Sequence, residues 1–142
     1  MILDFQNQMS DAQALTVTAV SEDVLDLDRD DNIGKGEPMA VAVTVGVAAD
    51  FTTTDETYQF TVQTATDAAF TSPITVVETG AINGDLLPAG HIVVLPIGHT
   101  NERFLRVNYT LAGTTPTITV DAYLVPLSDI DSWEAHTSGF TI

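Results

Sequence analysis

Apolar and polar residues alternate with a period of two along most of this chain of 142 residues. Because successive side chains of a β-strand point to opposite faces, such alternation predicts strands that are buried on one side. Eight stretches show it, at residues 15–19, 24–28, 39–47, 58–63, 74–79, 91–95, 105–111 and 117–124. They are bounded by Gly, Pro, Asn or Asp residues, which favour turns, so the sequence predicts about eight short strands.

The stretch at residues 39–47 places large branched residues on one face and small residues on the other. Val41, Val43 and Val45 share the first face, whereas the second face holds alanine, threonine and glycine. This pattern is typical of a strand that is covered on both sides, or of one whose outer face meets a neighbour.

No repeat and no linker interrupts these strands, so we expect a single domain over residues 1–142. The usual arrangement of eight such strands is an antiparallel β-sandwich of the jelly-roll type, which makes the protein all-β. Residues 1–13 precede the first predicted strand and are expected to form an N-terminal arm. One short helix is expected from Ser128 through about His136, since Ser128 can cap its first turn and acidic residues follow.

Charge narrows the range of partners, because 20 acidic residues face only four basic ones and give a formal net charge of −16. Phosphate binding needs clustered Lys and Arg, so neither nucleic acid nor an anionic membrane surface is an expected partner. The N-terminus lacks the basic and apolar regions of a signal peptide. The longest apolar run, residues 39–49, is too short to cross a bilayer, so we expect a protein made in a cytoplasm.

Candidate catalytic residues do not emerge from the sequence. Cysteine is absent, which excludes disulfides and thiolate chemistry, and His91, His99 and His136 lack the spacing of a zinc site. No nucleophile elbow, phosphate-binding glycine loop or dinucleotide fingerprint occurs. We therefore expect neither an enzyme nor a bound cofactor.

An acidic loop at residues 26–37 partly matches the calcium-binding loop of an EF-hand. Asp31, however, stands at the sixth position, where the sharp turn requires glycine, and Pro38 leads into a strand rather than a helix. The favoured interpretation is an acidic loop between two strands that holds no metal. If a calcium ion bound there, its ligands would be Asp26, Asp28, Asp30 and Glu37.

A few residues stand out as candidates for contact with another protein. Trp133, the only tryptophan, is expected either to cover one end of the sandwich or to anchor an interface. Arg103 and Arg106, two of the four cations, are expected either to form internal ion pairs or to mark a subunit contact. The apolar residues of the predicted arm are further contact candidates, namely Ile2, Leu3 and Phe5.

Six segments follow one another along the chain, at residues 9–16, 31–38, 55–60, 66–73, 87–91 and 103–109. In order and spacing they resemble the small capsid cement (decoration) proteins of tailed bacteriophages, as found in a Bordetella phage and its relatives. The resemblance covers most of the chain and rests on turns and strands rather than on a catalytic signature.

The resemblance implies a jelly-roll protein that oligomerises on the outer surface of a phage capsid. It also implies that the protein bridges neighbouring subunits of the major capsid protein after synthesis in the cytoplasm of an infected bacterium. Negative charge suits the outside of such a shell, because the inside is packed with DNA phosphates. Among closed homo-oligomers we favour a dimer over a trimer, since the dimer is the commonest form.

The alternative function is a non-catalytic module on the same fold, either carbohydrate-binding or associated with a tail or fibre. Such modules usually present aromatic side chains on one sheet face, or a calcium loop. Here only Tyr123 clearly alternates outward from a predicted strand, and the calcium loop is imperfect. The cement interpretation is therefore favoured over this one, and over a hydrolase.

Overall fold

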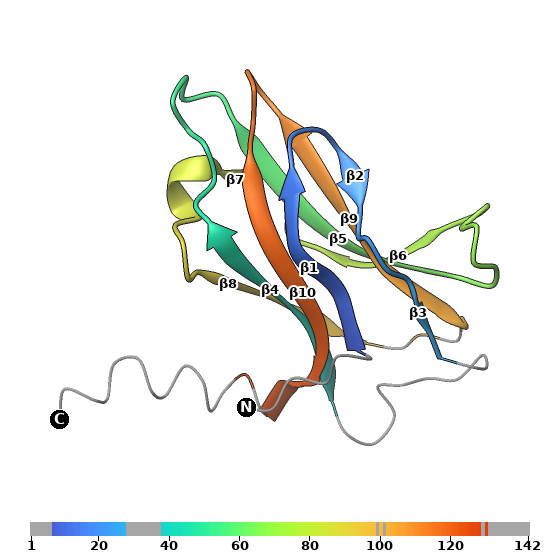
Figure 1. Ribbon diagram of the computed structural model, residues 1–142. Coiled ribbons are helices and arrows are strands. Elements are labelled where there is room, and N and C mark those ends of the chain that lie inside the picture. Colours follow the sequence, from blue (N-terminus) through green and yellow to red (C-terminus); the bar gives the residue numbers. More distant parts are fainter. Residues whose placement is uncertain (1–6, 28–37, 99, 101, 129, 131–142) are drawn as a thin grey trace, which may run out of the picture.

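The computed structural model describes residues 7–27, 38–98, 100, 102–128 and 130, and these residues form ten β-strands (Figure 1). The strands are β1 (Gln8–Leu15), β2 (Ala19–Val20), β3 (Leu25–Asp26), β4 (Met39–Val47), β5 (Thr57–Ala65), β6 (Ile74–Glu78), β7 (Ile82–Asn83), β8 (Ile92–Ile97), β9 (Phe104–Ala112) and β10 (Ile118–Pro126). One short 3-10 turn, η2 (Gly84–Leu86), precedes β8. The predicted all-β class is confirmed.

The strands form two antiparallel sheets that lie face to face as layers (Figure 1). The first sheet has the order β1-β10-β4-β8, and the second has the order β2-β9-β5-β6. Strand β3 also pairs with β9, and β7 also pairs with β5, so each edge of the second sheet consists of two short pieces. When each split edge is counted as one strand, the described residues form eight strands in the jelly-roll order, as predicted.

Strands β5 and β9 show how alternation builds the core. Their inward side chains are fully buried, namely those of Tyr58, Phe60, Val62, Leu105, Val107 and Tyr109. The rings of Phe60 and Tyr109 meet edge to face, with centroids 5.9 Å apart and planes at 86°. Burying each such side chain stabilises the fold by about 1.5–3 kcal/mol. Strands β5 and β9 are the two central strands of the second sheet.

Strand β4 is covered on both faces where Ala40 to Val43 lie, which is the first of the two arrangements that its pattern predicted. Val41, Val43 and Val45 pack in the core between the sheets. Ala40 and Ala42, on the other face, are also buried and belong to a second, smaller apolar cluster with Val125 and Ile130. The outer face of the first sheet is therefore apolar at its centre.

The predicted N-terminal arm at residues 1–13 is too long, because β1 already begins at Gln8. Met9 and Ser10 are fully buried in this strand. The sequence pattern missed it because pairing with β10 shifts register twice within β1, and Ala12 adopts a φ of 46°. Such bulges break the strict period of two that a sequence pattern detects. Residues 1–6 of the predicted arm lie outside the described residues.

The predicted strand at residues 15–19 is wrong for a related reason. Leu15 ends β1, and the chain turns before β2 begins at Ala19. Val17, expected to point into the core, is 67% exposed in that turn. Of the helix predicted from Ser128 through about His136, only Ser128 and Ile130 are described, and the remainder lies outside the described residues. No helix in the described part of the chain is long and apolar enough to cross a membrane.

Candidate interaction surfaces

The outward side chains of β9, β5 and β6 form a mainly polar surface, which we call the outer face of the second sheet. Its polar side chains are Gln59, Thr61, Gln63, Thr75, Glu78, Arg106, Asn108 and Thr110, and the paired positions at its two ends are Thr57 with Ala112 and Ala65 with Phe104. The register places Gln63 opposite Arg106, Thr61 opposite Asn108, and Gln59 opposite Thr110. The Gln59 amide donates a hydrogen bond of 3.0 Å to Glu78 Oε2, so the side chains of neighbouring strands support one another.

Arg106 is held on this face by two contacts. Its Nε donates a hydrogen bond of 2.8 Å to Gln63 Oε1, and its guanidinium carbon lies 4.1 Å from the centroid of the Phe70 ring. Phe70 comes from the turn between β5 and β6, where its N–H donates to Asp67 O, and it is buried beneath the arginine. Among the described residues no carboxylate lies within ion-pair distance of Arg106. Partial burial lowers the pKa of its guanidinium.

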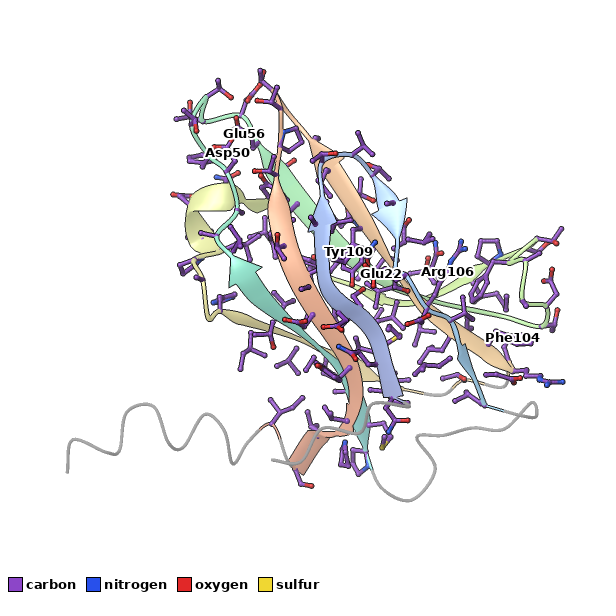
Figure 2. All side chains as sticks on the ribbon, in the orientation of Figure 1. Glu22, Asp50, Glu56, Phe104, Arg106 and Tyr109 are labelled. Carbon is purple, nitrogen blue, oxygen red and sulfur yellow. The ribbon has the colours of Figure 1, made fainter. Side chains whose placement is uncertain are left out.

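Arg103, in contrast, forms a bidentate ion pair with Asp26. Its Nε and Nη2 lie 2.7 Å and 2.8 Å from the two carboxylate oxygens, and its guanidinium also lies over the Phe104 ring. The pair ties β3 to the start of β9, at the edge of the outer face of the second sheet. Figure 2 shows Phe104, Arg106 and Tyr109 in succession along β9.

This arrangement gives the outer face of the second sheet an unusual charge. Its strands β9, β5 and β6 hold one cation, Arg106, and one acid, Glu78, and the ion pair of Arg103 with Asp26 lies at its edge. The formal charges within these three strands therefore cancel, although the whole chain carries −16. The other ten described acids lie on edges, loops and the first sheet.

The acidic loop proposed for calcium is only partly described. Asp26 accepts two hydrogen bonds from Arg103, whereas Asp28, Asp30 and Glu37 lie outside the described residues. Within the described ranges, no three His, Cys, Asp or Glu side chains are grouped as a metal site. The contact candidates Ile2, Leu3, Phe5 and Trp133 also lie outside the described residues.

The loops at one end of the sandwich are fixed by internal hydrogen bonds. The Tyr58 hydroxyl donates to Asp50 O at 2.8 Å and accepts from the N–H of Thr117 at 3.2 Å. Asp55 accepts from the hydroxyls of Thr53 and Thr114, and the pKa of its carboxyl is lowered, chiefly by the bond from Thr53. These contacts join the β4–β5 loop to the β9–β10 hairpin.

Glu56 lies beside Asp50 at this end of the sandwich and is fully buried (Figure 2). Its Oε1 accepts from the N–H of Thr53 at 3.2 Å, and its Oε2 has no hydrogen-bond partner among the described residues. No pocket opens among the described residues there or elsewhere.

Tyr123, the aromatic residue expected to point outward, is partly covered. It packs against the apolar cluster of Ala40 and Ala42, and its hydroxyl accepts a hydrogen bond of 2.9 Å from Gln8. It is therefore engaged within the first sheet instead of standing free as a platform for a ligand.

Sequence reasoning identified Arg103 and Arg106 but missed Phe70, Gln63 and Glu78. The alternation of β5 could have placed Gln63 on the outer face, because Tyr58, Phe60 and Val62 define the inner one. Phe70 carries no such signal, since it lies in a turn and reaches the face only through the fold.

In a comparison with protein-family models, residues 9–124 match the family described as Bbp16. The matched region runs from β1 to β10 and includes Arg103, Arg106 and Phe70. A search of curated proteins found no match.

Proposed function

The chain belongs to the Bbp16 family, and we propose from this that it is a capsid cement protein of a tailed bacteriophage. It binds the outer surface of the capsid and stabilises the shell by bridging neighbouring subunits of the major capsid protein. The family bears the name of a Bordetella phage protein, and this membership over residues 9–124 is the observation that carries the proposal.

The fold supports a role that depends on shape and surface. Two sheets with a shared apolar core give a rigid body with broad outer faces. Loops joined by Asp55 and Tyr58 keep one end of that body fixed. A bridging protein needs this rigidity, because a flexible protein loses conformational entropy when it binds, and this loss weakens its affinity.

The charge of −16 supports a position on the outside of the shell. Packaged DNA fills the inside with phosphates, which repel an acidic protein. On the outside the same charge keeps copies apart in solution until specific contacts overcome the repulsion. We propose that these contacts form a homo-oligomer, with a dimer favoured over a trimer, and that many weak capsid contacts sum to firm attachment.

The test uses capsids assembled without this protein. Purified protein is added, binding is measured by co-sedimentation, and capsid melting is followed by calorimetry. We expect saturable binding and a higher melting temperature of the capsid. An unrelated acidic β-sandwich protein serves as control, and an equal effect from it, or no binding by this chain, contradicts the proposal.

A further inference from the structure

We propose that the outer face of the second sheet is a self-association surface. Two copies of the chain pack these faces together across a two-fold axis, so that Arg106 of each copy pairs with Glu78 of the other. This inference deepens the proposed function, since it rests on the homo-oligomer proposed there, and it assigns that oligomer a surface and an ion pair.

Charge is the first reason for choosing this face. A chain with a net charge of −16 repels its own copies, and the repulsion is strongest where carboxylates face one another at close range. On the outer face of the second sheet, strands β9, β5 and β6 carry only Arg106 and Glu78, whose formal charges cancel. Among the described surfaces, a second copy therefore meets the least repulsion here.

The state of Arg106 is the second reason. Stacking on Phe70 and the hydrogen bond to Gln63 fix its guanidinium, and no described carboxylate neutralises it. A guanidinium presents five N–H donors in a rigid fork that matches a carboxylate. A partly buried guanidinium of this kind is stabilised most by a carboxylate that is already held in the right position.

Glu78 is the matching acceptor on the same face. It is exposed on β6, opposite Thr61, and its Oε2 accepts only from the neutral amide of Gln59. In a two-fold contact, residue i meets residue j and residue j meets residue i. A face that holds both Arg106 and Glu78 satisfies this requirement and forms the pair twice.

The residues between the pair permit close approach. Arg106 lies on β9 and Glu78 on β6, so a two-fold axis in the plane of contact crosses β5 near Thr61 and Gln63. These central side chains are uncharged, and Thr61 scarcely projects from the surface. The apolar cluster around Ala40 and Ala42 on the first sheet is less suitable, because those residues are already buried in the single chain.

Charge exchange in the full-length chain tests the pair directly. Sedimentation velocity is measured for the unmodified protein, for Arg106→Glu, for Glu78→Arg, for the double variant, and for an equal mixture of the two single variants. We expect a dimer for the unmodified protein and at least a tenfold weaker dissociation constant for each single variant. We expect the double variant and the mixture to recover dimerisation to within about threefold. The double variant restores both pairs with the charges exchanged, whereas the mixed dimer holds one exchanged pair and one original pair.

Asp85→Arg is the matched control, since it makes the same charge change as Glu78→Arg in an exposed turn outside strands β5, β6 and β9. It is expected to leave dimerisation unchanged. Circular dichroism and melting temperature verify that each variant folds. A monomeric unmodified protein, unchanged association in both single variants, or absence of rescue in the double variant and the mixture overturns the proposal.

Capsid binding by the same proteins separates this inference from the proposed function. A monomer that still stabilises capsids overturns the self-association surface and leaves the cement function standing. A dimer that fails to bind capsids overturns the cement function and leaves the self-association surface standing. If the unmodified protein is monomeric and Arg106→Glu abolishes capsid binding, the face receives a carboxylate of the capsid, and the second copy is excluded as its occupant.

Discussion

The hydroxyl of Tyr109, on the second sheet, lies 2.7 Å from the hydroxyl of Ser10, on the first. Both residues are fully buried, so this hydrogen bond joins the two layers through the core. The Ser10 hydroxyl also lies 2.7 Å from Gln13 Oε1, which continues the network toward the edge of the first sheet. The bond therefore fixes the bulged strand β1 to the opposite sheet.

Tyr109→Phe should lower the free energy of unfolding by about 1–3 kcal/mol, because a buried hydroxyl loses its partner. Urea denaturation monitored by circular dichroism gives the value. Removing both hydroxyls, in Tyr109→Phe with Ser10→Ala, should cost less than the sum of the two single changes. Strict additivity would show that the two hydroxyls contribute independently.

The same tyrosine predicts a loss of stability at high pH. Burial raises the pKa of the Tyr109 hydroxyl above its usual value of 10.0. Above pH 10 the unfolded chain releases this proton while the folded chain keeps it, so the free energy of unfolding falls as pH rises. Tyr109 alone contributes a slope of about 1.4 kcal/mol per pH unit.

Urea denaturation between pH 8 and pH 11.5 measures that slope, and Tyr109→Phe should make it shallower. Burial also raises the pKa of Tyr58 and of Tyr123, so some dependence should remain in the variant. An identical slope in both proteins would contradict the prediction.

At low pH, Asp55 should make the free energy of unfolding fall as the pH decreases, whereas Tyr109 makes it fall as the pH rises. Hydrogen bonds, chiefly from Thr53, lower the pKa of its carboxyl, so the folded state binds the proton less readily than the unfolded chain does. The stability that the carboxylate contributes is present above about pH 4 and is lost as pH falls below that value. Asp55→Asn should flatten the decline between pH 4 and pH 2.5, measured by thermal melting, and an identical decline in both proteins would contradict the prediction.

Alanine substitutions at three glycines distinguish the cost of backbone strain from the cost of a steric clash. Gly113→Ala should destabilise by about 3 kcal/mol, because φ is 101° and the added Cβ would lie 2.5 Å from Asp55 O. Gly90→Ala should cost only about 1–2 kcal/mol, since φ is 88° but no atom lies within 4 Å. Gly98→Ala, with neither constraint, should be nearly neutral. Urea denaturation of the three variants measures this order, and any other order contradicts the prediction.

The long strands were predictable because each buries one side against the core. In β9, for example, Leu105, Val107 and Tyr109 alternate with polar residues without interruption. Strands β2, β3 and β7 have two residues each, too few for a period to be recognised. Strand β1 was misplaced because its bulges shift the apolar positions out of phase.

The candidate site was predictable only as single residues. Arg106 stood out because cations are rare in this chain, but no pattern links it to Phe70, Gln63 or Glu78, which come from other segments. Their meeting depends on the register of β5 against β9 and on the turn after β5. Such relationships arise from the fold and leave no periodic trace in the sequence.

Within the described residues, every open edge of the two sheets is interrupted. Strand β1 is bulged, Pro96 removes a donor from β8, and the edges β2–β3 and β6–β7 are each broken into short pieces. An intact edge would offer its free backbone groups to a foreign strand and seed fibrous aggregates. Concentrated solutions of this protein should therefore resist strand-by-strand polymerisation, because no side of either sheet provides a continuous template.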